Sequence, residues 1–170
     1  MRDFVIADDI LAPKPKIVIE YRGPNPFAIY PRISGLLQSI FQARGVNYFE
    51  DDFRWDITTD PRQFLLRMHL EKGFDKFSQG RVDLKIIGHQ PSDPKKNGAI
   101  FIEIAASIKT EYPSSTPFQK LIVLPFMFLY HYFYYNRIRR QYMRRYRVGV
   151  EKLEAEIRST FNLIMREKIA

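Results

Sequence analysis

The sequence predicts an α+β fold, in which an antiparallel sheet of about five strands is covered by one short helix and a long C-terminal helix. Apolar and polar residues alternate through most of residues 46–112, which is typical of strands with one buried face. Before and after this region, apolar residues recur every three or four positions, which predicts helices. The breaks between the alternating segments are short, and short connections favour neighbouring antiparallel strands.

The chain is predicted to form one domain preceded by an arm. Residues 1–15 end in a segment with two prolines, which favours extended backbone, so they are predicted to be an N-terminal arm. Residues 16–170 are predicted to be a single α+β domain, since 170 residues with 45% hydrophobic side chains suffice for one core. Its C-terminal helical region is predicted at 117–168, with Pro125 kinking or breaking the segment that precedes it.

A strand and a short helix are predicted to open the domain. Alternation over residues 16–22 predicts the strand, which Gly23 ends. The helix is predicted to begin in the turn that contains Pro31 and to end at Gly45. Residues three or four positions apart predict its buried face: Ile33, Leu36, Leu37, Ile40 and Phe41.

Four more strands are predicted between residues 46 and 112. One side of each is apolar, and the other carries charged residues of both signs that suit a wet surface with weak pairing. The residues predicted to face the core are Phe53, Trp55 and Ile57, then Phe64, Leu66, Met68 and Leu70, then Val82, Leu84 and Ile86, and finally Ile100, Ile102, Ile104, Ala106 and Ile108.

The C-terminal region is predicted to contain one long amphipathic helix from about residue 126 to residue 166. Gly149 is a weak point for helix formation inside it. Its apolar stripe consists of Ile138, Tyr142, Tyr146, Val150, Leu153, Ile157, Phe161 and Ile164.

This order of elements resembles that of helix-grip proteins, the Bet v 1 and START-like class. In that class a curved antiparallel sheet wraps a long C-terminal helix around an apolar cavity. The resemblance lies in the order of elements alone, with fewer strands and no residue motif, so what it implies for this chain is a helix-grip-like layout.

The most unusual feature is an apolar aromatic block, residues 121–135, joined to an arginine block, residues 136–147. The arginine block carries a net charge of +6 without an acidic residue, out of +8 for the whole chain. Positive charge concentrated in one short segment indicates contact with an anionic partner. The candidate anion-binding residues are Arg137, Arg139, Arg140, Arg144, Arg145 and Arg147, and the candidate apolar anchors are Phe126, Phe128, Tyr132 and Tyr135.

Several interpretations of the two blocks remain open. The apolar block could be a buried cover of the sheet, with the arginines as its solvated continuation. Arginine and tyrosine together also suit an anionic lipid surface, an apolar protein partner, or nucleic acid. A hydrophobic small molecule in a cavity between sheet and helix, and a homo-oligomer formed through the long helix, are further alternatives. Because the apolar run directly adjoins the basic one, we favour a non-catalytic binding or scaffold protein that docks on a membrane surface or apolar partner.

The apolar block is too short to span a bilayer, because a spanning helix needs about 20 apolar residues and residues 121–135 are fewer. We therefore expect a cytoplasmic, membrane-associated protein. The chain contains no cysteine, which fits a reducing compartment and excludes thiolate chemistry.

No catalytic residue, cofactor or metal is predicted. The three histidines, His69, His89 and His131, lack metal-ligand spacing, and the glycines do not form a phosphate-binding loop. The sequence Asp83-Leu84-Lys85 could serve a metal-dependent nuclease, but so short a pattern arises easily by chance. Its additional ligands would come from Glu50, Asp51 and Asp52.

Overall fold

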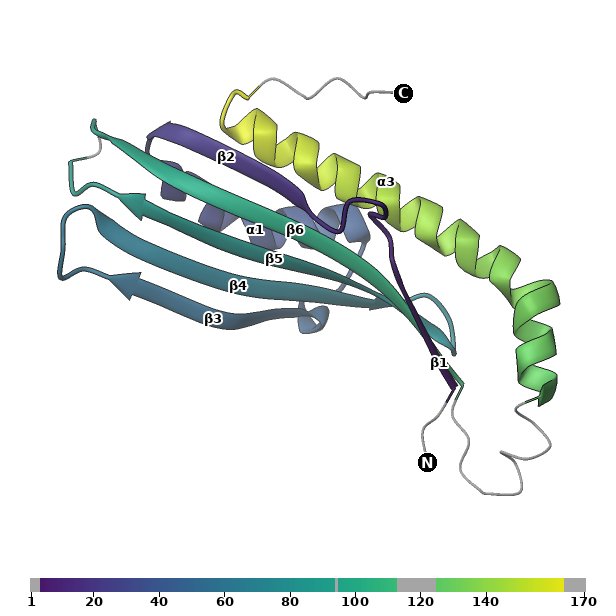
Figure 1. Cartoon of the computed structure of the whole chain (residues 1–170). Coiled ribbons are helices and arrows are strands. Elements are labelled where there is room, and N and C mark those ends of the chain that lie inside the picture. The colour runs from purple at the N-terminus through teal and green to yellow at the C-terminus, as the bar shows by residue number, and fades with distance from the viewer. Residues whose placement is uncertain (1–3, 94, 113–124, 164–170) are drawn as a thin grey trace.

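The protein has two layers, a six-stranded antiparallel sheet and, over one face of it, two helices (Figure 1). The computed structural model describes residues 4–93, 95–112 and 125–163. The architecture is the α+β arrangement that the sequence predicted, with a short helix and a long C-terminal helix on the same side of the sheet.

The sheet is an antiparallel meander extended by two N-terminal strands. The order of the strands is β1-β6-β5-β4-β3, and β2 also pairs with β6. The strands are β1 (Phe4–Asp9), β2 (Ile17–Pro24), β3 (Tyr48–Asp56), β4 (Arg62–Gly73), β5 (Ser78–Gln90) and β6 (Asn97–Tyr112). Strands β3 to β6 follow one another in space as in the chain, as short connections lead one to expect.

Strand β1 lies within residues 1–15, which were expected to be an extended arm. Strand β2 pairs with β6 from Asn97 to Ile104, so the second half of the long strand β6 has a free edge, and β1 pairs with it. Ile10 and Leu11, which follow β1, are buried in the hydrophobic core. The N-terminal segment is therefore part of the sheet and of the core.

Strand β3 forms the other edge of the sheet and is less covered than predicted. Trp55 packs against the core, but Phe53 is 47% exposed, and Ile57 lies beyond the end of the strand and is 70% exposed. Phe27 and Tyr30 reach over this edge, through ring contacts with Trp55 and Phe53. The helices cover the middle of the sheet better than its β3 edge.

The short helix α1 (Tyr30–Phe41) follows a 3-10 turn, η1 (Pro26–Ile29), and precedes a second one, η2 (Gly45–Asn47). It buries Ile33, Leu37 and Phe41, which belong to the predicted face. It ends before Gly45, because Gln42 takes the left-handed conformation that terminates the helix, with φ of 50°.

The long helix has three consecutive parts. Residues 125–130 are α-helical, residues His131–Tyr135 form a π-helical turn, η3, and α3 runs over Asn136–Thr160. The predicted continuation beyond residue 163 and the predicted kink before Pro125 lie outside the described residues. The stripe from Tyr146 to Phe161 is buried, as predicted, through Val150, Leu153 and Ile157.

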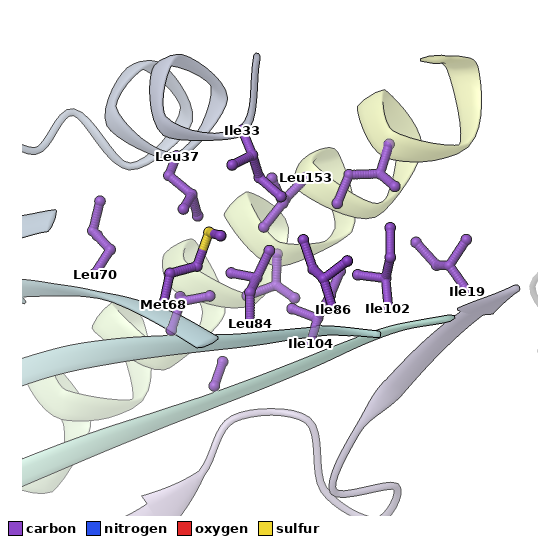
Figure 2. Packing of buried hydrophobic residues seen from close by; sticks show 14 of the residues in the cluster. Ile19, Ile33, Leu37, Met68, Leu70, Leu84, Ile86, Ile102, Ile104 and Leu153 are labelled. Carbon is purple, nitrogen blue, oxygen red and sulfur yellow. The ribbon is translucent and has the colours of Figure 1, made fainter. Parts of the chain in front are cut away.

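The core lies between the sheet and both helices, where Figure 2 shows Ile33 and Leu37 of α1 and Leu153 of α3 facing the side chains of the sheet. The two helices approach each other closely at Gly149. A Cβ atom at this position would lie 2.8 Å from Cε1 of Phe41, so glycine permits the crossing. The sequence indicated Gly149 as a weak point in the helix, and the structure shows that glycine is needed there for the two helices to pack closely.

Candidate functional site

The first turns of the long helix expose their aromatic side chains. Figure 1 shows these turns at the end of the sheet that β1 reaches, at an angle to the rest of α3. We call residues 126–134 the aromatic turns. Seven of their large side chains are between 41% and 78% exposed: Phe126, Phe128, Leu129, Tyr130, Tyr132, Phe133 and Tyr134. These seven side chains therefore do not form a buried cover of the sheet.

Three side chains tie this end of the helix to the sheet. They are His131, Tyr135 and Arg139, spaced four residues apart, and they are only 9%, 2% and 3% exposed. Each is a polar group with a polar partner in the sheet or its connections. The end of the helix that exposes its aromatic residues is thus attached to the domain by hydrogen bonds.

The two buried anchors His131 and Tyr135 lie at the ends of the π-helical turn. The backbone N–H of Asn136 donates to the carbonyl of His131, five residues earlier, so the turn contains one residue more than an α-helical turn. His131 and Tyr135, at the two ends of the turn, are buried, whereas Tyr132 is exposed. The result is a run of three consecutive exposed aromatic residues, 132–134, between two buried anchors.

Tyr135 connects the helix to the turn between β4 and β5. Its hydroxyl donates to the Asp75 carboxylate, with an Oη to Oδ2 distance of 2.7 Å, and lies 2.8 Å from Oγ of Ser78. Burial opposes ionisation of Asp75, but hydrogen bonds from the backbone of Phe77, from Tyr135 and from other neighbours outweigh it and lower the pKa of this carboxyl. Burial also raises the pKa of the Tyr135 phenol, which keeps it neutral and able to donate.

Arg139 connects the helix to both β6 and β1. Its Nε donates to Oγ1 of Thr110 at 2.9 Å, and its Nη1 forms an ion pair with Asp8. The second terminal nitrogen, Nη2, is buried without a hydrogen-bond partner among the described residues. Arg139 therefore acts inside the molecule, and its guanidinium is closed to an outside anion in this conformation.

His131 lies over the end of β6. Its Nδ1 is 2.9 Å from the hydroxyl of Tyr112, which can donate to an unprotonated ring nitrogen. Burial and then the positive charge of Arg139 lower the pKa of the imidazole, while Asp8 acts in the opposite direction. The ring is accordingly a neutral acceptor near pH 7.

The remaining candidate residues lie outside. Four candidate arginines are exposed and form no ion pair with a carboxylate in the described part of the chain: Arg137, Arg140, Arg144 and Arg145. Arg147 is also exposed, but its Nε lies 3.7 Å from Oε1 of Glu151. Among the apolar candidates, Phe126, Phe128 and Tyr132 are exposed, whereas Tyr135 is buried. We therefore leave Tyr135 and Arg139 out of the candidate contact surface.

Several carboxylates of the outer sheet face form pairs with basic side chains. Asp51 lies 2.7 Å from Nδ1 of His69, and Asp83 accepts a hydrogen bond from Nε of Arg81 at 2.8 Å. Within residues 4–93, 95–112 and 125–163, no three acidic or histidine side chains come together to hold a metal ion. This face matches the mixed, weakly paired surface that the strand pattern predicts.

Sequence reasoning missed the polar ties of the helix. A signal existed, because Tyr135, Arg139 and Tyr142 continue the buried stripe of Tyr146 toward the N-terminus at spacings of three or four residues. Their partners, Asp8 and Asp75, come from the N-terminal arm and from a turn, and only the folded chain places them together.

Within the described ranges, no helix combines the length and apolar character that crossing a membrane requires. The chain matches none of the models of known protein families, and no curated protein matches it.

Proposed function

We propose that this protein is a non-catalytic docking or scaffold protein that binds an anionic membrane surface through the aromatic turns and the neighbouring arginines. The observation that carries the proposal is the joint exposure of both groups on one continuous helix. Aromatic side chains favour the boundary between headgroups and acyl chains, and arginines favour anionic headgroups. A surface that offers both at adjoining positions fits a bilayer interface.

The energetics favour such an encounter. A basic residue near an anionic membrane surface contributes about 1 kcal/mol, so the four exposed arginines, which pair with no carboxylate among the described residues, give a substantial, salt-dependent attraction. Partial burial of Phe126 and Phe133, which are 72% and 78% exposed, adds a hydrophobic contribution that salt does not screen. The ties through Tyr135 and Arg139 hold this surface in place before binding, which reduces the entropy lost on docking.

The other candidate functions have less support. A nucleic acid would contact the arginines through its phosphates and could stack bases on the exposed aromatic rings, but an aliphatic side chain such as Leu129, which is 51% exposed, gains nothing from base stacking. A carrier of a hydrophobic small molecule needs space between sheet and helices, and buried side chains such as Ile86, Ile102 and Leu153 pack there. The exposed aromatic turns therefore favour the membrane surface.

Liposome flotation tests the proposal. We expect the protein to float with vesicles that contain phosphatidylserine, to float less as salt is added, and to stay behind with vesicles of phosphatidylcholine alone. Replacing Phe126 and Phe133 together by serine is expected to weaken binding about tenfold or more. The matched control is Phe53→Ser, which removes an exposed phenylalanine from β3, at the edge of the sheet opposite β1, and should bind like the unchanged protein.

Two outcomes would contradict the proposal. Equal recovery with neutral and anionic vesicles would remove the arginines from the binding surface. Salt-sensitive binding of a random single-stranded oligonucleotide, together with no binding to any vesicle, would assign the strip to nucleic acid instead.

A further inference from the structure

The exposed arginines line a hollow on the outer side of the long helix. Its volume is about 530 Å³, and it begins within the aromatic turns and continues along α3. The described residues that line it are Tyr132, Asn136, Arg137, Arg140, Gln141 and Arg144. All six side chains carry N–H or O–H donors, and none of them carries a carboxylate. The chemistry of the lining is therefore that of an anion site.

The charges in this hollow are not compensated by the described part of the protein. Arg137, Arg140 and Arg144 are spaced three and four residues apart, so their side chains are neighbours on one helix face and repel one another. Further along the same helix the pattern differs, because Arg147 lies near Glu151 and Arg158 pairs with Glu154. A bound anion would relieve the repulsion that acidic residues relieve elsewhere.

The arrangement favours an anion with several terminal oxygens. A guanidinium presents a planar fork of donors, and such forks bind carboxylates and phosphates in a bidentate manner. A phosphate monoester has three terminal oxygens and carries up to two negative charges near pH 7. It can accept hydrogen bonds from three arginines at once, whereas a phosphodiester offers only two terminal oxygens and one charge.

The position of the hollow fits a headgroup attached to a bilayer. Tyr132 belongs both to the aromatic turns and to the lining of the hollow. Phe133, the next residue, is the most exposed of the aromatic side chains in these turns. A phosphate in the hollow would thus lie beside side chains that enter the apolar boundary, as a lipid headgroup lies beside its acyl chains.

We propose that this hollow selectively binds the phosphomonoester headgroup of an anionic lipid, with Arg137, Arg140 and Arg144 as the phosphate contacts. The inference rests on the proposed membrane docking and specifies the lipid class that the surface prefers. Asn136, Gln141 and the hydroxyl of Tyr132 supply the additional donors.

Vesicle binding at matched surface potential tests this selectivity. One set of vesicles contains phosphatidic acid and the other contains enough phosphatidylserine to reach the same zeta potential. We expect the protein to bind the phosphatidic acid vesicles at least about tenfold more tightly, as charge-assisted hydrogen bonds require. Arg140→Ala should lose this preference.

Two further variants separate the hollow from general charge. Arg145 is exposed on the same helix but does not line the hollow, so Arg145→Ala should weaken binding to both vesicles by about fivefold and leave the preference intact. Arg140→Lys keeps the charge without the planar fork, so it should weaken binding to phosphatidic acid vesicles more than binding to phosphatidylserine vesicles and thereby lower the preference. All three substitutions are at exposed positions, and circular dichroism would verify the fold.

The outcomes distinguish this inference from the proposed function. Equal binding of both vesicles at matched potential, with Arg140→Ala and Arg145→Ala equivalent, would overturn the headgroup site and leave membrane docking standing. Binding to neither vesicle would overturn both. Titration calorimetry with inorganic pyrophosphate completes the test. If the protein binds the free anion as tightly as it binds phosphatidic acid vesicles, the hollow is a site for a soluble ligand, and the proposal of a lipid headgroup is overturned.

Discussion

The two ends of the long helix are attached to the same sheet by different chemistry. From Tyr146 to Phe161 the helix buries apolar side chains against the core, and Val150, Leu153 and Ile157 are fully covered. At the other end, contact depends on three polar anchors, while most side chains between and before them are exposed. One element thus combines an end packed into the core with an end whose large apolar side chains are exposed.

This difference has a physical consequence for both ends. Apolar contacts are non-directional and depend on buried area, so the C-terminal end contributes most to stability. Hydrogen bonds between buried groups contribute less in net terms but fix position and orientation. The N-terminal end is therefore fixed in position by its hydrogen bonds with little apolar burial of its own, which is what the proposed docking surface would require.

The largest expected effect compares one leucine from each end. Leu153 is fully buried, whereas Leu129 is 51% exposed. Leu153→Ala should reduce the free energy of unfolding by about 2 to 5 kcal/mol, because it leaves a cavity in the core. Leu129→Ala should change it by less than about 0.5 kcal/mol. Urea denaturation followed by circular dichroism gives both values. Comparable losses of unfolding free energy would show that the aromatic turns contribute to stability as much as the core does.

A second comparison uses two consecutive arginines. Arg139 is buried and bonded to Thr110 and Asp8, whereas Arg140 is exposed. Arg139→Ala should cost about 2 kcal/mol of unfolding free energy, because Thr110 loses a buried partner and Asp8 its counter-charge. The cost stays below that of a fully buried pair, since Asp8 is about half exposed and water can reach it.

Arg140→Ala should remain within about 0.5 kcal/mol of the unchanged protein in the same denaturation experiment. The two variants remove the same charge from adjacent positions, so they share every effect of net charge. Equal stability of the two would mean that the polar anchors do not hold the helix.

The sequence predicted the elements whose residues show a regular pattern. The alternation of Leu66, Met68, Leu84 and Ile86 identified the central strands, and the spacing from Tyr146 to Phe161 identified the buried stripe of the helix. In these segments the period of the apolar residues matches the period of the backbone, so local pattern and tertiary packing agree.

The rest depends on contacts between distant segments. Strand β6 is longer than β2, and β1 pairs with the part of β6 that β2 does not cover. This pairing depends on the length of β6 and not on a pattern within residues 4–9. The inward orientation of Arg139 requires Asp8 and Thr110, which lie far away in the sequence. The π-helical turn adds one residue to a helical turn, and the spacing of the apolar residues in the sequence does not predict it.

The smallest expected effect concerns His131 and the response of the two ends to acid. Among the described residues, the groups around its ring include Tyr112 of β6, Asp8 of β1, and Tyr135 and Arg139 of the helix itself. Burial and the charge of Arg139 hold the pKa of His131 below its ordinary value of about 6.5. As pH falls below that value, the unfolded chain binds a proton that the folded chain does not, so the folded state loses stability.

The contribution of His131 is thus fully present above pH 6.5 and declines as the pH falls from there toward the lowered folded value. Unfolding free energies at pH 7.5, 6.5 and 5.5 should fall more steeply for the unchanged protein than for His131→Gln, whose side chain does not titrate and can still accept a hydrogen bond from Tyr112. Parallel curves would exclude His131 as a source of acid sensitivity. Hydrogen exchange, corrected for its intrinsic pH dependence, should locate the loss in residues 126–135 and leave residues 146–160 protected, because only the N-terminal end is held by a group that acid can charge.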